Sequence, residues 1–292
     1  MILLGVYCQM SEDLRKIILH AVDLPAIPTI ARKVVKALAN PDTNIHDLNN
    51  IIAKDQALSA RILKIANSAM YYCQREIHTL SMAMSRIGFT SLKIIVLAVS
   101  TKDIYKSFGE YEKLLWEHSV GVSIASQTVA QAVGGFKPDE IFTGGLMHDI
   151  GKTLLNNKDP IKYGQVFQKV HKGGKTFTEA EQMIYGFTHA EAGSLLIDKW
   201  NLPEILTDVI RIHHVLDLQD PIPQTTLRTA AVINLADLIC FKLGIGYKQP
   251  IDDFNLCESL SAQELAINED SLENLINQTS NAFENNKDVF LG

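Results

Sequence analysis

The stretch GGLMHDIGKT, residues 144–153, brings an imidazole, a carboxylate and an ammonium group together as His148, Asp149 and Lys152. On a helix, His148 and Asp149 lie within one turn of Lys152, because residues three and four apart share a face. Apolar residues recur every four positions through the same region, at Phe142, Leu146, Ile150 and Leu154. This spacing predicts one helix with a polar patch, although a His-Asp pair alone is more often a packed or surface feature.

The glycines of this stretch raise the alternative of a phosphate-binding loop. That motif, G-x-x-x-x-G-K-[ST] after a strand, curls backbone amides around phosphates. Here five residues separate Gly145 from Gly151, Leu146 stands where the motif needs glycine, and residues 138–143 have no strand character. We therefore reject a phosphate loop.

Other histidines and acidic residues stand on apolar helix faces elsewhere in the chain. His118 follows Leu114 and Leu115 by one turn, and His213 repeats that placement after Val209 and Ile210. Asp237 likewise follows Ala230 and Ile233. Inward-facing imidazoles and carboxylates are costly unless they share partners or bind a metal. Helix bundles often build metal sites from facing helices, so we expect these residues to converge on a metal.

The elements that must position these groups are helical. Hydrophobic residues recur at intervals of three and four along most of the chain, and alternating strand patterns are scarce. Asn44, with Asp47 three residues on, is a helix N-cap, and Pro203 lies near a helix start. The apolar run 92–99, after Thr90-Ser91, is interpreted as a buried helix. The predicted fold class is all-α, with an N-terminal helical bundle followed by a second helical domain.

Three parts of the chain differ in pattern: an N-terminal bundle over 1–110, a histidine-bearing unit over 111–246 and an acidic helical segment over 247–292. Residues 250–292 hold nine Asp/Glu and one Lys within a chain of net charge −6. Apolar residues of this segment are expected to dock on the body of the protein in preference to a partner: Leu256, Leu260, Leu265, Leu272, Leu275, Ile276 and Phe283.

Composition excludes several classes of function. A chain of 292 residues with 47% hydrophobic content can bury a full core. It has no cluster of basic residues that would bind a nucleic acid backbone and no apolar stretch long enough to span a bilayer. We therefore expect neither nucleic acid nor a membrane as a partner. Four cysteines without CxxC spacing argue against a disulfide framework, which predicts a cytoplasmic protein.

Several longer motifs resemble a known family. The order His118, His148-Asp149, Asp237 is similar to the H…HD…D signature of the HD superfamily of metal-dependent phosphohydrolases. The segments LPAIPTIARKVVKAL, AKDQALSARILKIANSAMYY and REIHTLSMAMSRIGFTSLKIIVLAV resemble the HDOD family, including its LxxANSAxY stretch at residues 63–71. The downstream LWEHSV, GGLMHDIGK, HAEAGSLLIDKWNLP and IRIHH also resemble HDOD, so the likeness covers roughly residues 20–240.

The resemblance implies a bacterial signalling or regulatory module with a set of metal ligands. Residues matching those of the related HD-GYP phosphodiesterases imply one divalent ion held by His118, His148, Asp149 and Asp237. They imply a second ion held by Asp149, His189 and His213, with His214 near or replacing His213. Imidazole and carboxylate ligands suit Fe, Mn, Zn or Ni. In an enzyme, Asp149 and Lys152 would be the catalytic residues.

Two departures from HD-GYP enzymes put a cyclic-dinucleotide pocket in doubt. No Gly-Tyr-Pro follows the histidine pair, and Leu114 replaces an acidic ligand found in some three-metal relatives. Three hypotheses follow. The first is a regulatory module that keeps its metals and acts on another signalling protein. The second is a phosphohydrolase or phosphodiesterase acting on a nucleotide or cyclic dinucleotide. The third is a metal-free helical scaffold.

Overall fold

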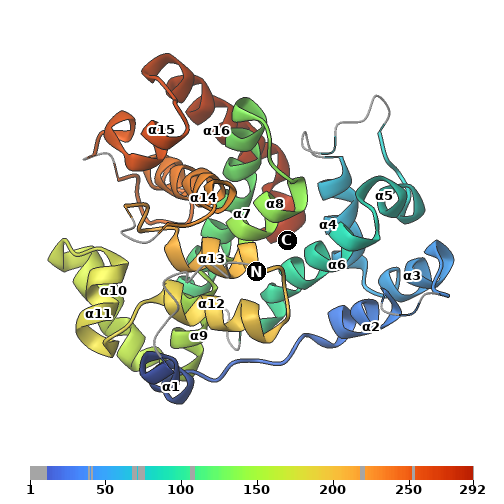
Figure 1. Cartoon of the computed structure of the whole chain (residues 1–292), viewed down its shortest axis with the longest axis horizontal. Helices are drawn as coiled ribbons and strands as arrows, with labels where there is room; N and C mark the ends of the chain where they lie inside the picture. The colour runs from blue at the N-terminus through green and yellow to red at the C-terminus, as the bar shows by residue number, and fades with distance from the viewer. Residues whose placement is uncertain are drawn as a thin grey trace, which may run out of the picture.

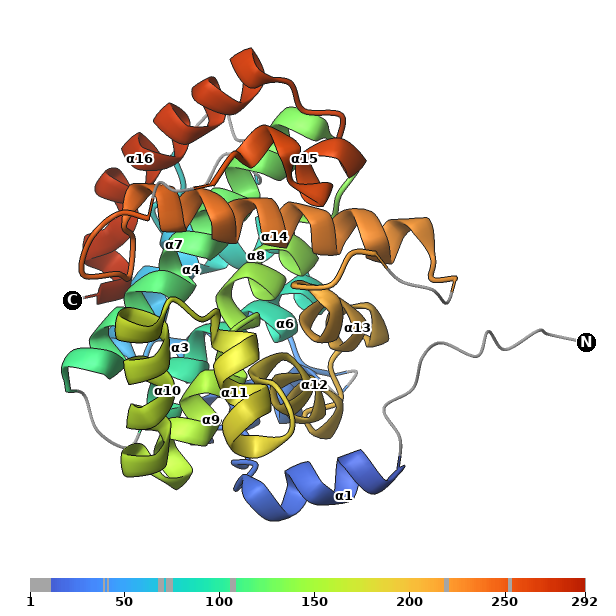
Figure 2. The same cartoon turned by 90° about the vertical axis from the view of Figure 1, so that its left-hand side faces the viewer.

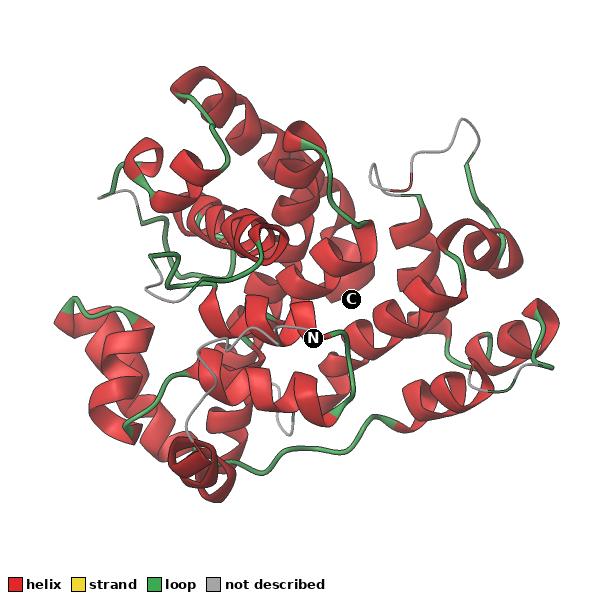
Figure 3. Ribbon diagram, viewed as in Figure 1, coloured by secondary structure: helices red, strands yellow, loops and turns green. Residues whose placement is uncertain are grey.

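The computed structural model describes residues 12–38, 40, 42–67, 71, 76–105, 109–217, 221–251 and 254–291, and every element in them is helical (Figure 3). The predicted all-α class is confirmed. Several positions named from the sequence lie outside the described residues: Cys8 within residues 1–11, residues 68–70 and 72 of the family-like segment, and Cys73. No single helix in the described ranges is long and apolar enough to cross a bilayer.

The helices follow one another in the order shown in Figure 1. The first group comprises α1 Glu12–Ala21, α2 Thr29–Leu38, α3 Ile45–Ile52, α4 Gln56–Ala66, α5 Leu80–Ile87, α6 Phe89–Val99 and the 3-10 helix η2 Ser100–Ile104. The second comprises α7 Glu110–Val133, α8 Pro138–Met147, α9 Ile150–Lys158, α10 Pro160–Gly173, α11 Phe177–Tyr185, α12 His189–Lys199, α13 Glu204–Ile212 and α14 Gln224–Leu243. The last comprises η3 Leu256–Glu258, α15 Leu260–Glu264 and α16 Glu269–Leu291.

The predicted helix starts are largely confirmed. Asn44 caps α3 and forms a reciprocal capping box with Asp47, and Pro203 immediately precedes α13. Residues 92–99 lie in α6, as expected. That helix begins at Phe89, however, so Thr90 and Ser91 lie within its first turn and not before it.

Helix α7 is the central element, and α8, α14 and α16 pack directly against it (Figure 2). Helix α6 packs on α8 and so joins the N-terminal helices to the histidine-bearing helices. One apolar core runs through both groups, from Ile18 and Ile95 to Leu196 and Ile210. The two groups therefore share buried surface, which fixes α7, α8 and α9 relative to each other.

The acidic C-terminal segment docks on the body, as predicted. Leu265, Leu272 and Phe283 are buried, whereas Leu260 is 52% exposed and was wrongly placed on the docked face. A hydrogen bond to a backbone carbonyl near the end of α16 joins this helix to α7. Trp116 Nε1 donates to Phe290 O at 2.9 Å.

The single helix predicted across the HD pair is wrong. Helix α8 ends at Met147 and α9 begins at Ile150, with Asp149 between them at φ −99° and ψ 10°. The four apolar residues of the predicted stripe are all buried, because both helices turn them toward the same core. The chain therefore changes direction at the two residues that the sequence marks as ligands.

The glycines around the break allow close packing of backbones. A Cβ on Gly145 would lie 2.7 Å from Ser123 Cα in α7, and one on Gly151 would lie 1.9 Å from the carbonyl oxygen of His189 in α12. Neither distance leaves room for a side chain. The glycines that resembled a phosphate loop bring α8 against α7 and α9 against α12.

Candidate metal centre

The structure brings together all seven residues predicted as ligands. His118 and Asp237 come from the middles of α7 and α14, and His189 is the first residue of α12. The others lie at helix ends: His148 and Asp149 at the break between α8 and α9, and His213 and His214 directly after α13. Side chains of the cluster are 3% exposed or less, apart from His214 at 21%.

One half of the cluster gathers around Asp149 Oδ2. His148 Nε2 lies 3.3 Å from this oxygen and His118 Nε2 lies 3.6 Å from it. Asp237 Oδ1 is 2.9 Å from His118 Nε2 and 3.9 Å from His148 Nε2. Two ligand atoms bound to one ion at about 2.1 Å are roughly 3.0–3.4 Å apart in octahedral or tetrahedral geometry. The observed separations are close to that range.

The other half gathers around Asp149 Oδ1. His189 Nε2 lies 3.0 Å and His213 Nε2 3.8 Å from this oxygen. His214 Nε2 is 3.0 Å from His189 Nε2. Asp149 thus presents one carboxylate oxygen to each half. Two compact groups of atoms can each hold a metal ion: those of His118, His148 and Asp149, and those of Asp149, His189, His213 and His214.

Four imidazoles are oriented with Nε2 toward the centre. Nδ1 of His118 faces Ile245 O at 3.1 Å, that of His148 faces Gly145 O at 2.8 Å, and that of His213 faces Ile210 O at 2.7 Å. Nδ1 of His189 faces Glu181 Oε2 at 2.6 Å. A carbonyl or carboxylate oxygen only accepts, so Nδ1 carries the proton. Nε2 of His148 and Nε2 of His213 have no hydrogen-bond partner among the described residues, so in the neutral ring each has its lone pair free, the arrangement of metal-binding histidines.

The residues fit a metal because three inward atoms lack hydrogen bonds. Nε2 of His148, Nε2 of His213 and Asp149 Oδ1 are buried without a hydrogen-bond partner among the described residues, although His189 Nε2 is at ion-pair distance from that oxygen. Leaving a buried acceptor unsatisfied costs about 1–3 kcal/mol. A cation between these atoms would remove that cost.

Electrostatics in the pocket shift the pKa values of two ligand histidines in opposite directions. Burial and the neighbouring His148 and His189 lower the pKa of His213 to about 3, so this ring is neutral. Burial also works to lower the pKa of His189, but Glu181 and Asp149 outweigh it and raise that pKa to about 9. His189 therefore must give up a proton when a metal binds.

Lys152 places a second cationic group beside Asp149. Its Nζ lies 2.6 Å from Asp149 Oδ2 and 4.0 Å from the centre of the Phe177 ring. Burial works to raise the pKa of Asp149, but His148, Lys152 and His189 hold it well below its usual range. The carboxylate is therefore ionised throughout the physiological range.

The approach to the cluster is narrow. The cavity beside it has room for about 20 Å³ of water, enough for one or two molecules. It is lined by Leu114, Leu115, His118, Asp149, Lys152, Phe167, Phe177, Gly246 and Tyr247. A nucleotide does not enter this cavity unless the lining residues move.

Sequence reasoning missed the residues that orient the ligands. Glu181 does not stand out among the acidic residues of the sequence, but it is fully buried and accepts hydrogen bonds from His189. Glu181 and His189 lie on different helices, so helical spacing could not predict that their side chains meet. Glu179 and Glu191 instead complete capping boxes at the starts of α11 and α12.

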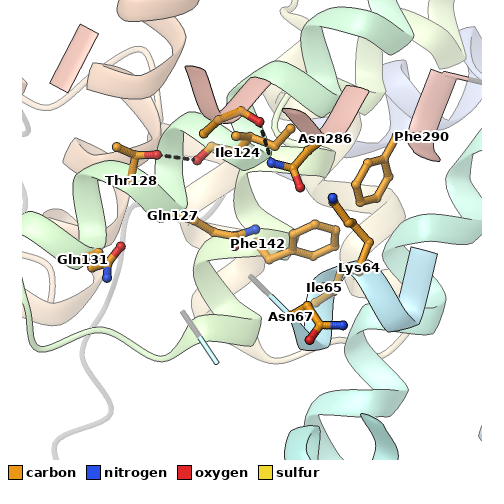
Figure 4. A pocket seen from close by; sticks show the side chains of 11 residues that line it. Lys64, Ile65, Asn67, Ile124, Gln127, Thr128, Gln131, Phe142, Asn286 and Phe290 are labelled. Atoms are coloured by element: carbon orange, nitrogen blue, oxygen red, sulfur yellow. Dashed lines mark hydrogen bonds between the residues drawn. The ribbon is translucent and has the colours of Figure 1, made fainter. Parts of the chain in front are cut away.

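A second pocket lies apart from the cluster, where α4, α7, α8 and α16 meet. Figure 4 shows the amides of Gln127 and Asn286 and the amine of Lys64 around the ring of Phe142. Asn286 donates to Ala282 O and Lys64 to Asn285 O, so these groups bond to the C-terminal helix. This pocket contains none of the predicted ligands.

Comparison with known proteins matches the HDOD domain model to residues 24–216. The chain belongs to the HDOD family. This HDOD chain is 25% identical to an uncharacterised protein of Treponema pallidum (strain Nichols) over 214 residues, which are 73% of this chain. It spans 42% of the length of that relative.

Solved structures share the fold of this HDOD protein. An HDOD domain protein of unknown function from Geobacter sulfurreducens has a TM-score of 0.67 at 25% identity, covering 92% of this chain and 94% of that one. A candidate phosphohydrolase from Shewanella amazonensis SB2B has a TM-score of 0.66 at 24% identity, with 94% and 98% covered. A candidate signal transduction protein from Marinobacter aquaeolei VT8 has a TM-score of 0.63 at 15% identity, with 96% and 65% covered. Identities below 25% establish the fold alone.

Proposed function

We propose that this protein is a regulatory HDOD module that holds two divalent transition-metal ions and acts by contact with another signalling protein. The observation that carries the proposal is the placement of Asp149. Its two oxygens face two separate groups of histidine Nε2 atoms, as a carboxylate bridging two ions would. Imidazole and carboxylate ligands suit Fe, Mn, Zn or Ni.

The ligands are assigned to the two ions by distance. The first ion would be held by His118, His148 and Asp149, with Asp237 beside His118 and His148 as a fourth ligand. The second would be held by Asp149, His189, His213 and His214. His214 belongs to the second group because its Nε2 approaches His189, whereas its Nδ1 is 4.0 Å from Asp237 Oδ2. Glu181 and the backbone carbonyls keep the rings turned inward.

The closed surroundings of the cluster favour regulation over turnover. A buried site with room for one or two waters can link α7, α8, α9, α12, α13 and α14 through shared ions. A phosphohydrolase needs its phosphoryl group beside the ions, and Phe167, Phe177 and Tyr247 occupy that approach. The ions would act here by fixing the relative positions of helices.

Lys152 is the feature that favours the alternative, a phosphohydrolase acting on a nucleotide or cyclic dinucleotide. Bound ions supply Lewis acidity toward phosphoryl oxygens. The buried ammonium of Lys152, beside Asp149 in the same cavity, is placed to offset charge that develops on a phosphoryl group. Under this alternative, Phe167 and Phe177 must open to admit substrate.

The test is metal content of protein purified anaerobically without a metal-affinity tag, followed by phosphodiesterase assays of the same samples. The wild type should carry about two ions per chain, and Asp149→Ala should carry less than half as much. His46→Ala is the matched control, because His46 is exposed and outside the cluster. Unchanged metal in Asp149→Ala refutes the ligand assignment. Phosphodiester hydrolysis by the wild type that disappears in Asp149→Ala would refute the regulatory module and support the phosphodiesterase.

A further inference from the structure

Glu181 connects the candidate metal centre to a different part of the protein. Its carboxylate is fully buried and accepts three hydrogen bonds. Tyr163 in α10 donates its hydroxyl to Oε1 at 2.7 Å. His189 donates its backbone N–H at 2.7 Å and its Nδ1–H at 2.6 Å to Oε2. A single carboxylate in α11 therefore holds both α10 and the first residue of α12.

His189 is oriented differently from His148 and His213. His148 and His213 donate to carbonyls three residues earlier, within the last turns of their own helices. Those rings are fixed by local structure. The orientation of His189 depends instead on a charged side chain from another helix, so it depends on where α11 lies.

Helices α10 and α11 form a hairpin, residues 160–185, at one edge of the molecule (Figures 1 and 2). Aromatic contacts join its two helices, with ring centres of Phe167 and Phe177 5.7 Å apart and those of Tyr163 and Tyr185 6.4 Å apart. Phe177 also contacts Lys152 through its ring face. The hairpin thus reaches the cluster at two points, Glu181 and Phe177.

The outer side of the hairpin is exposed and partly apolar. Ile161 is 85% exposed and Met183 is 63% exposed. A change in the order of the hairpin therefore changes the surface that the protein presents to solvent.

We propose that Glu181 couples metal binding to the order of the α10–α11 hairpin, so that the hairpin reports whether the centre is loaded. The inference rests on the proposed metal site. A metal ion at Nε2 of His189 would displace the proton there and fix the ring beside Asp149, while Nδ1–H still donates to Glu181. The fixed ring holds α11 through Glu181, and Glu181 holds α10 through Tyr163. Coupling is reciprocal, so the hairpin must favour metal binding by the factor by which metal stabilises the hairpin.

The experiment combines Mn²⁺ titration with amide hydrogen exchange of the full chain, with and without Mn²⁺. In the wild type, Mn²⁺ should slow exchange in residues 160–185 roughly tenfold or more. Glu181→Gln should weaken Mn²⁺ binding by about 10–100-fold, the usual cost of losing a group that orients a ligand. It should also reduce the protection that saturating Mn²⁺ gives the hairpin. Tyr163→Phe should keep most of the affinity but lose part of the protection of α10.

The matched control is Glu179→Gln, on the same helix. Glu179 is exposed and completes a capping box with Thr176, and glutamine also serves in that motif. It should bind Mn²⁺ and protect the hairpin as the wild type does. If Glu181→Gln binds Mn²⁺ as tightly as this control and its hairpin is equally protected from exchange, the proposed coupling is wrong. Slower exchange in α9 and α12 with an unchanged hairpin overturns it too, while leaving the metal site in place. A wild type that carries no metal on purification and binds no Mn²⁺ removes the proposed function and the coupling together.

Discussion

Replacing Gly151 by alanine should damage both the fold and the metal centre. A Cβ at Gly151 would lie 1.9 Å from the carbonyl oxygen of His189 and 2.9 Å from its Cα. Carbon and oxygen normally approach to about 3.2 Å, so α9 and α12 must separate by roughly 1.3 Å. The neighbour is backbone at the start of a helix, and its N–H is bonded to Glu181, so it cannot rotate away as a side chain could.

The size of the effect follows from two opposed contributions. Overpacking costs up to about 3 kcal/mol, and the better helix propensity of alanine returns about 1 kcal/mol. The net loss of about 2 kcal/mol corresponds to a fall in Tm of roughly 4–8 °C, at about 2–4 °C per kcal/mol. The same shift moves Asp149 away from His189, whose facing atoms are now 3.0 Å apart. Functional sites tolerate displacements of only about 0.5 Å, so metal content should fall.

Thermal unfolding and elemental analysis of Gly151→Ala measure both effects. The matched control is Gly164→Ala in α10, where a Cβ would have no atom within 4 Å. This control should raise stability by about 0.5–1 kcal/mol, because alanine replaces glycine in a helix without a clash. A Gly151→Ala protein with wild-type Tm and full metal content would refute the reasoning, since α9 and α12 would then not be in backbone contact.

Three further predictions concern other parts of the molecule. Asp149→Asn, which keeps shape but removes charge, should lose at least half of the metal seen in the wild type by elemental analysis, and full retention would contradict a bridging carboxylate. Asn67→Ala removes both hydrogen bonds to the backbone of Ile77, so it should lower the free energy of unfolding by about 1–3 kcal/mol in urea titrations; a loss below about 0.5 kcal/mol would argue against this role. In the metal-free protein, the pKa of His213 is lowered to about 3 and that of His189 is raised to about 9, around an ordinary value of about 6.5. Unfolding therefore takes up protons below pH 6.5 and releases them above it, so Tm measured in chelator should peak near that pH; a Tm that climbs steadily to pH 9 is the contrary outcome.

Sequence reasoning reached the all-α fold and the members of the cluster for one physical reason. Polar groups on apolar helix faces are expensive, so His118, His213 and Asp237 stood out against their surroundings. The motif likeness then added His189 and His214. These residues are recognisable because the signal lies within their own helices or motifs.

Features that arise between helices were not predictable in the same way. The break at Asp149 is hidden because the apolar repeat continues unchanged from Phe142 to Leu154. Glu181 resembles any glutamate on an amphipathic helix until Tyr163 of α10 and His189 of α12 contact it in the folded protein. Gly151 could not be distinguished from a loop glycine, because its role is set by the carbonyl of another helix.

The local hydrogen bonds of His148 and His213 bear on the order in which the protein folds and takes up metal. Each ring is tied to a carbonyl in the last turn of its own helix, so its rotamer is fixed once that helix has formed. The loss of side-chain entropy costs about 0.5–1.5 kcal/mol for each immobilised side chain. This cost is then part of the free energy of folding and not of the free energy of metal binding. An ion would meet a preorganised frame in a protein that has already folded. Metal loading and unloading can then occur repeatedly without refolding of the core.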